Sequence, residues 1–144
     1  MHVTIFGTGA LGCLFGARLA PVAEVTLVGS WTEALDAIGR RGILLEEGAG
    51  SRSVRVRTAR LGEGTPAADL ALVLVKSWQT GTIAPHLGPA LGEGGVALTL
   101  QNGLGNLERL GPGAFGGSTT EGAALLGPGH VRAAGGGPTV VAAP

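Results

Sequence analysis

Residues 7–12 read Gly-Thr-Gly-Ala-Leu-Gly, and they directly follow the apolar segment 2–6, which reads His-Val-Thr-Ile-Phe. The three glycines have the spacing G-x-G-x-x-G. When such a sequence joins a strand to a helix, backbone N–H groups and the helix N-terminus meet at one point, where they can bind a diphosphate. The location after a predicted strand therefore favours a dinucleotide-binding turn over an ordinary strand-to-helix connection that binds nothing.

Each glycine of this turn is expected to serve a different purpose. Gly7 permits the tight turn, Gly9 leaves room for phosphates to approach the backbone, and Gly12 lets the helix pack closely on the strand. The functional site is thus predicted to begin at the first turn of the chain.

The composition is typical of one globular domain. The chain has 144 residues, 44% of them hydrophobic, and we interpret its 28 glycines as tight turns in a compact fold. The formal net charge is zero and only 14% of residues are charged, against about 25% in typical domains, so the sequence offers no electrostatic basis for binding nucleic acid. We therefore predict a single domain over residues 1–144.

The cysteine and the hydropathy pattern predict a cytoplasmic protein. The single cysteine, Cys13, cannot form an internal disulfide and is expected to be a small core residue. The longest apolar run, residues 70–75, is far shorter than the roughly 20 residues that a membrane-spanning helix needs. We expect a soluble protein without a membrane partner.

The predicted elements alternate between strands and helices over most of the chain. A strand at 2–6, a helix at 10–20 ended by Pro21 and a strand at 24–28 form the first β–α–β unit. The further elements, in chain order, are a helix at 30–40, short strands at 43–45 and 54–57 that form a hairpin or an edge excursion, a buried strand at 70–75, an irregular helix at 79–90, a strand at 96–100, a short helix ending near 110, and β segments near 121–126, 130–134 and 138–142. This order predicts the α/β fold class, with a doubly wound (Rossmann-type), mostly parallel sheet and a β-rich C-terminal end.

Polar residues follow several of the predicted strands. In a doubly wound sheet, ligands bind outside the carboxyl ends of the strands. The glycine turn is therefore expected to share one crevice with the polar residues that follow later strands, which are Ser30, Lys76, Gln79, Gln101 and Asn102. Trp31 and Trp78 also follow strands, and we expect them to form aromatic walls of the crevice.

The residue after the second strand usually separates NAD from NADP. A carboxylate at this point binds the ribose 2′-hydroxyl and repels a 2′-phosphate, but the segment 28–30, Val-Gly-Ser, has none, which disfavours a site for NAD alone. Two roles remain open for Ser30. It could donate a hydrogen bond to a 2′-phosphate, or it could be only the N-cap of the next helix, because its spacing to Glu33 matches a capping box.

Lys76 and Asn102 are the candidates for catalytic groups. Lys76, the single lysine, is expected to be desolvated at the end of a buried strand unless an anion or carbonyl lies near it, or else to extend into solvent. Asn102 could orient a substrate hydroxyl or bind a nicotinamide ribose, or it could cap a helix. No metal site is predicted, because no metal-ligand spacing occurs among the three histidines, His2, His86 and His130.

Four separated motifs point to a known family. They are the segment 7–12 (GTGALG), the segment 76–80 (KSWQT), the segment 102–106 (NGLGN) and the segment 117–120 (GSTT). Together and in this order they resemble the ketopantoate reductase (2-dehydropantoate 2-reductase) family, and the likeness extends from Met1 to Thr139.

The resemblance implies an oxidoreductase that uses NADPH to reduce ketopantoate, a 2-keto acid, to pantoate on the route to pantothenate and coenzyme A. Hydride would pass from the nicotinamide to the keto carbon, while the protein orients the reactants and supplies a proton donor. The resemblance also implies positions at the pyrophosphate, namely Gly7, Thr8, Gly9, Ala10, Leu11 and Gly12. It places Lys76 and Gln79 in the cofactor cleft, Asn102 at cofactor and substrate, and Ala123 beside the cofactor.

The chain departs from this family in two respects. Family members usually carry an Arg after the second strand to hold the 2′-phosphate, where this chain has Ser30. They also continue into a helical domain that supplies a catalytic lysine, and the sequence ends at Pro144, where that domain would begin. We therefore expect cofactor binding with little turnover, and a homo-oligomer or the helical domain as the missing partner. The alternative is a stand-alone dinucleotide-sensing regulatory domain or an assembly domain without catalysis.

Overall fold

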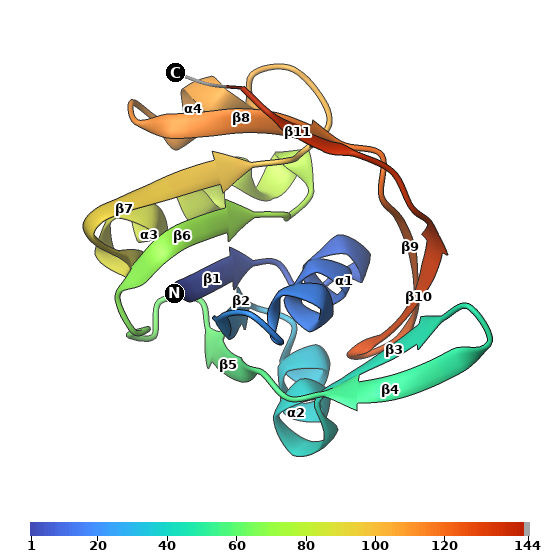
Figure 1. Cartoon of the computed structure of the whole chain (residues 1–144). Coiled ribbons are helices and arrows are strands. Elements are labelled where there is room, and N and C mark those ends of the chain that lie inside the picture. The colour runs from blue at the N-terminus through green and yellow to red at the C-terminus, as the bar shows by residue number, and fades with distance from the viewer. Residues whose placement is uncertain (143–144) are drawn as a thin grey trace.

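The first β–α–β unit forms as the sequence predicts. The computed structural model describes residues 1–142. Strand β1 (His2–Phe6), helix α1 (Ala10–Leu19) and strand β2 (Glu24–Gly29) follow one another, and β1 pairs with β2 in parallel (Figure 1). Apolar side chains on both faces of these strands are buried, which is typical of parallel strands covered on both sides.

The main sheet has the strand order β11-β8-β7-β6-β1-β2-β5. All neighbouring strands are parallel except β11 and β8, which are antiparallel. The further elements of this layer are α2 (Thr32–Arg41), β5 (Arg57–Arg60), β6 (Ala68–Val73), the short helix η1 (Ser77–Gln79), α3 (Thr80–Ala90), β7 (Leu91–Thr99), α4 (Asn106–Leu110), β8 (Ala114–Thr119) and β11 (Thr139–Val141). From β5 to β8 this is the doubly wound order, and the direction of winding reverses between β1 and β6. The predicted fold class is therefore confirmed.

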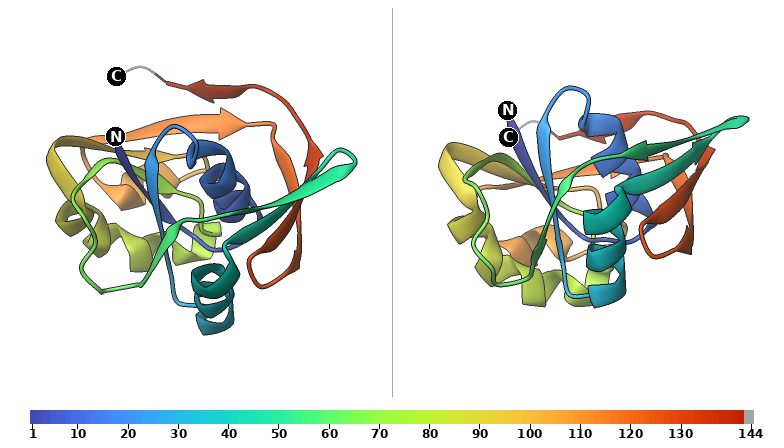
Figure 2. Two further views of the ribbon diagram at one scale, coloured as in Figure 1. Left: turned by 60° about the horizontal axis from the view of Figure 1, so that its bottom comes forward. Right: turned by 90° about the horizontal axis from the view of Figure 1, so that it is seen from below.

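A second sheet covers α1 on the side away from the main sheet. It consists of β4 (Gly50–Val54), β3 (Ile43–Glu47), β10 (His130–Gly135) and β9 (Gly122–Gly127), in that order. Strand β3 pairs in parallel with β10, so the middle and the C-terminal part of the chain share one sheet. Figure 1 shows α1 between the two sheets, and Figure 2 shows the tip of the β3–β4 hairpin projecting from the rest.

The core of the molecule surrounds α1. One buried cluster joins Ile5 of β1 and Leu14 of α1 to Leu45 and Val131 of the second sheet, and all four side chains are fully buried. Cys13 belongs to the same cluster, as predicted, and its burial raises the pKa of the thiol to about 12. The thiol therefore stays protonated and serves as a small apolar side chain.

The sequence prediction is wrong at one strand, and it misses the strands β5 and β8. The segment 54–57 is not a strand, because β4 ends at Val54 and the chain then enters the main sheet as β5. Strand β8 was not predicted, since its glycines hide the apolar pattern of a buried strand. The C-terminal β segments do form, but β9 and β10 join the second sheet whereas β11 joins the main sheet. Hydropathy along the chain says nothing about which sheet a strand joins.

Replacing Gly12 with Ala tests the contact that seats α1 on β1. A Cβ atom at position 12 would collide with the carbonyl oxygen of Gly7 and lie 2.8 Å from its carbonyl carbon, and backbone atoms cannot move aside as a flexible side chain can. We expect Gly12→Ala to lower the free energy of unfolding by about 1–3 kcal/mol or more, measured by chemical denaturation.

Gly39→Ala is the matched control. Gly39 lies in α2, where an added Cβ would meet only the Thr58 Oγ1 at an ordinary 3.6 Å. This variant should gain up to about 1 kcal/mol from helix propensity. Equal stability of the Gly12→Ala and Gly39→Ala variants would contradict the proposed close packing.

Candidate functional site

A cavity of about 550 Å³ opens at the carboxyl ends of β1, β2 and β6. Its walls come from the glycine turn, from the residues that follow β2, β5 and β6, from the start of α3 and from the beginning of β9. The lining residues are Gly7, Thr8, Gly9, Ala10, Leu11, Gly29, Ser30, Trp31, Leu61, Leu74, Val75, Lys76, Gln79, Thr82, Ile83, Glu121, Gly122, Ala123 and Leu125. The volume falls in the range of small-molecule and cofactor sites, about 300–1,000 Å³. The site is not filled by the protein's own side chains.

The glycine turn forms one wall of this main cavity. Gly7 has φ +132°, and its N–H donates to the Val28 carbonyl oxygen over 2.9 Å, which closes the turn against β2. A Cβ at Gly9 would meet nothing within 4 Å, so this position faces open space. Gly12 does not line the cavity, because it is buried against the Gly7 carbonyl oxygen. The turn and packing roles predicted for Gly7 and Gly12 are thus confirmed.

The start of α1 points its unpaired backbone donors toward this space. Gly9 is the N-cap, and the first N–H groups of any α-helix lack partners within the helix. The first turn of α1 contains no acidic side chain, so nothing on the helix itself offsets the positive end of its dipole. An anionic group is therefore favoured at this end of the main cavity.

Lys76 lies at the rim rather than in a desolvated position. Strand β6 ends at Val73, and the next residues lead to the open edge of the sheet, where the Lys76 side chain is exposed. Of the two alternatives left open by the sequence, the structure shows the solvent-exposed side chain and not the desolvated one. The Lys76 N–H donates to Gln79 Oε1 over 3.2 Å, which ties the beginning of η1 together and holds both side chains on the cavity wall.

Ser30 lines the cavity and does not cap α2. The N-cap of α2 is Trp31, in an extended conformation and without a side-chain cap hydrogen bond, so the predicted capping box does not form. Trp31 forms part of the cavity wall, as expected. Trp78 does not, because it lies on η1 with its side chain 79% exposed.

Asn102 lines a second, smaller cavity of about 160 Å³ that adjoins the main one. The two cavities share Leu11, Lys76 and Glu121 among their walls. Helix α4 begins at Asn106 with Gly105 as its N-cap, so Asn102 caps no helix. The Asn102 carbonyl oxygen accepts hydrogen bonds from Ser77 Oγ at 2.9 Å and from Asn106 Nδ2 at 3.1 Å, and these bonds fix its loop while the side chain stays exposed.

A hydrogen-bond network under the smaller cavity escaped the sequence analysis. Gln101 Nε2 donates to the Val75 carbonyl oxygen at 2.6 Å, and Thr80 Oγ1 donates to Asn106 Oδ1 at 3.0 Å. Gln101 and Thr80 also contact each other, so the loops after β6 and β7 are joined by side chains. The sequence placed Gln101 after a strand, but only the fold shows its partners.

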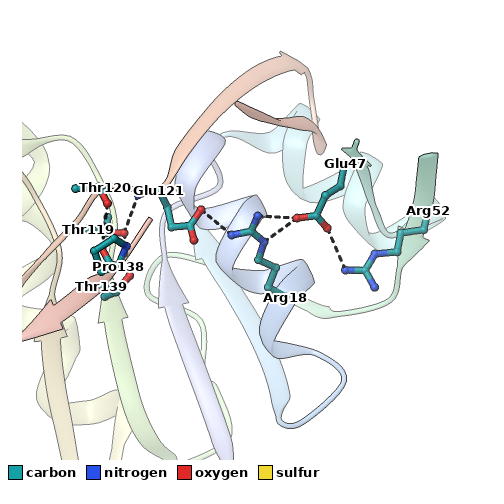
Figure 3. Close-up of polar contacts among 8 residues, drawn as sticks. All are labelled: Arg18, Glu47, Arg52, Thr119, Thr120, Glu121, Pro138 and Thr139. Atoms are coloured by element: carbon teal, nitrogen blue, oxygen red, sulfur yellow. Dashed lines mark hydrogen bonds and ion pairs between the residues drawn. The ribbon is translucent and has the colours of Figure 1, made fainter. Parts of the chain in front are cut away.

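Glu121 is the main residue of the cavity that the sequence analysis missed. It lies between β8 and β9, next to Gly122 and Ala123, and so faces the glycine turn across the cavity. Its Oε2 lies 2.7 Å from Arg18 Nη1 of α1, and Arg18 Nη2 lies 2.6 Å from Glu47 Oε1 (Figure 3). No sequence motif indicated this pair, because the two residues are brought together only when the second sheet covers α1.

The Arg18 guanidinium compensates the charge of the Glu121 carboxylate. The hydrogen bond with Arg18 is the largest cause that lowers the pKa of Glu121, and the bonds with Glu121 and Glu47 raise the pKa of Arg18. A negative charge in the cavity wall is thus held by a positive charge on the helix behind it.

The described part of the chain contains neither a metal-binding cluster nor a membrane-spanning helix. Within residues 1–142, no group of three or more His, Cys, Asp or Glu side chains could hold a metal ion. None of the helices in this range has the length and apolar character needed to span a membrane.

The fold is that of Rossmann-type α/β proteins. Similarity to known sequences identifies the family within this fold class. The profile of the family Ketopantoate reductase PanE/ApbA matches residues 3–144. The 2-dehydropantoate 2-reductase of Halobacterium salinarum is 39% identical over 148 residues, which cover 98% of this chain and 48% of the relative. That of Pyrococcus horikoshii is 37% identical over 147 residues, with 98% and 47% covered. The chain therefore belongs to the ketopantoate reductase PanE/ApbA family, and it spans about half the length of these curated relatives.

Solved structures agree with this assignment. A PanE/ApbA family ketopantoate reductase from Ralstonia eutropha superposes with a TM-score of 0.89 at 34% identity, covering 98% of this chain and 49% of the other. A D-mandelate dehydrogenase, solved with NADH and anilino(oxo)acetate, superposes with a TM-score of 0.86 at 26% identity, covering 94% and 46%.

Replacing Glu121 with Gln tests the ion pair at the cavity wall. Because Arg18 lowers the pKa of Glu121 below its usual value of 4.5, the pair stabilises the folded state above that pH, and this contribution is lost as the pH falls through the lowered pKa. We expect Glu121→Gln to be less stable than the wild type near neutral pH, and the difference to shrink below pH 4.5. Chemical denaturation over a pH series measures both.

Glu93→Gln controls for the loss of one negative charge, because Glu93 is exposed on β7 and forms no ion pair within residues 1–142. A stability difference for Glu121→Gln that stays constant as the pH falls would show that the effect does not come from the carboxylate charge.

Proposed function

We propose that this chain binds NADP(H) and is the cofactor-binding part of a 2-dehydropantoate 2-reductase. The observation that carries the proposal is the open main cavity between the glycine turn and Ala123, at the edge of the sheet where doubly wound proteins bind nucleotides. Family membership supports the choice of cofactor class, since the related D-mandelate dehydrogenase was solved with NADH.

The residues of the cavity fit a dinucleotide. At Gly9 a Cβ would point into open space, so the backbone can approach a diphosphate closely there. The first N–H groups of α1 supply donors for its oxygens, and the proposed contacts are Gly7, Thr8, Gly9, Ala10 and Leu11, with Gly12 acting through packing. Trp31, Leu61 and Ile83 add apolar surface suited to an adenine ring.

The reacting end of the cofactor would lie where the two cavities meet. Lys76 lines both cavities and Asn102 lines the smaller one, so we assign them the catalytic roles, with Gln79 and Ala123 as cofactor contacts. The Lys76 ammonium can donate a hydrogen bond to a keto oxygen, and the Asn102 amide can orient a hydroxyl group. A bound reduced nicotinamide supplies the hydride for the keto carbon.

The activity of the whole protein is a further part of the proposal. We infer a 2-keto acid substrate, a place in pantothenate biosynthesis and a cytoplasmic location from the curated relatives, of whose length this chain spans about half. The 144 residues alone should bind the cofactor and turn over little substrate. A helical second domain or another copy of the chain is the proposed partner that completes the substrate site.

Replacing Gly9 with Ala tests cofactor binding at the turn. The methyl group occupies space that the diphosphate needs but touches no protein atom, so the variant should keep its stability. We expect NADPH to bind at least about tenfold more weakly in isothermal titration calorimetry. Gly39→Ala should bind NADPH as the wild type does. A wild-type chain that binds neither NADPH nor NADH would refute the proposed function.

Replacing Lys76 with Ala tests its place at the cofactor. Because the side chain is exposed and its charge is screened, we expect NADPH affinity to fall only about two- to fivefold. Lys76→Arg keeps the charge and should retain most of the affinity. Unchanged binding in Lys76→Ala would mean that the side chain points to solvent and away from the cofactor.

A further inference from the structure

Strand β5, which the sequence analysis did not predict, ends beside the main cavity. Leu61, the residue that follows the strand, lines the cavity, and Arg60 precedes it. Strand β5 runs parallel to β2, and in this register Arg60 lies opposite Gly29. The Leu61 N–H donates to the Gly29 carbonyl oxygen over 2.9 Å, and Leu61 lines the cavity together with Ser30. Arg60 therefore ends its strand beside the residue that precedes Ser30.

The side chain of Arg60 crosses the turn between β2 and α2. Its Nη1 donates to Oγ1 of Thr32, the first residue of α2, over 3.0 Å. The backbone below it is fixed, because the Arg60 N–H donates to Glu63 Oε2 at 2.8 Å and the Glu63 N–H donates to the Arg60 carbonyl oxygen at 3.0 Å. The guanidinium is thus held at the turn that carries Ser30.

The guanidinium of Arg60 is not engaged by a carboxylate. Arg18, Arg52 and Arg132 each lie within 4.0 Å of a glutamate carboxylate oxygen, whereas within residues 1–142 no such oxygen lies that close to Arg60. A guanidinium carries five N–H donors in one plane, and the bond to the Thr32 hydroxyl uses one of them. Glu63, three residues after Arg60, and Glu33, three residues after Ser30, do not line the main cavity.

We propose that Arg60, with Ser30, recognises the 2′-phosphate of the cofactor and makes the site select NADP(H) over NAD(H). This inference rests on the proposed function. The planar donors of arginine match the oxygens of a phosphate monoester, and the Ser30 hydroxyl is available because it does not cap α2. The cation comes from the end of β5, which lies beside the end of β2 in the main sheet.

The test compares the dissociation constants of NADPH and NADH for the wild type, Arg60→Gln and Arg57→Gln. Arg57 is the matched control, because it is exposed on the same strand but lies opposite Thr26, away from the carboxyl edge of the sheet. Arg60→Gln should raise the dissociation constant of NADPH at least about tenfold and change that of NADH less than about twofold. Arg57→Gln should change either constant less than about twofold, and added salt should weaken NADPH binding more in the wild type than in Arg60→Gln.

Several results would overturn the assignment. Equal weakening of NADPH by Arg57→Gln and Arg60→Gln would show an effect of net charge alone, and equal weakening of both cofactors by Arg60→Gln would show a general loss of the site. A wild-type chain that binds NADH as tightly as NADPH would refute the role of Arg60 and leave dinucleotide binding intact. A wild-type chain that binds neither would refute the proposed function as well.

Discussion

The close contact between Gly12 of α1 and the Gly7 carbonyl oxygen at the end of β1 sets the position of everything around the cavity. Because no side chain fits between them, the helix can lie directly on the turn, and its first N–H groups emerge at the carboxyl edge of the sheet. A single added methyl group would move the helix and with it the donors that face the cavity. The same contact therefore serves stability and the geometry of the site.

The second sheet turns α1 into a central element. A helix on the face of an open sheet normally exposes one side, but here Leu45 and Val131 cover that side, and Cys13 and Leu14 are fully buried. This cover also brings the β8–β9 connection across from the glycine turn. The main cavity thus has walls from both sheets, and each wall is anchored to the same helix, by the glycine turn on one side and by the Arg18–Glu121 pair on the other.

Local sequence patterns predicted the elements that form the first half of the site and not those that complete it. The run 2–6, the glycine turn and the run 70–75 carry hydropathy and turn signals strong enough to place Lys76 at the cavity edge in advance. Strand β5 is a polar edge strand and β8 is rich in glycine, so neither has such a signal. The contributions of Arg60 and Glu121 depend on which strands become neighbours, and this is decided by pairing between distant segments.

The distribution of charge around the cavity favours an anionic ligand even though the chain as a whole is neutral. Lys76 and Glu121 are the charged residues among those that line it. The Glu121 carboxylate is already held by Arg18, so it adds little net repulsion toward an anion, while no carboxylate oxygen within residues 1–142 lies within 4.0 Å of the Lys76 ammonium. The positive end of α1 and the Arg60 guanidinium at the end of β5 also favour an anionic ligand. Few residues of the chain are charged. The pairing of the Glu121 carboxylate with Arg18 and the accessible Lys76 and Arg60 side chains are therefore sufficient to make the site favour an anion.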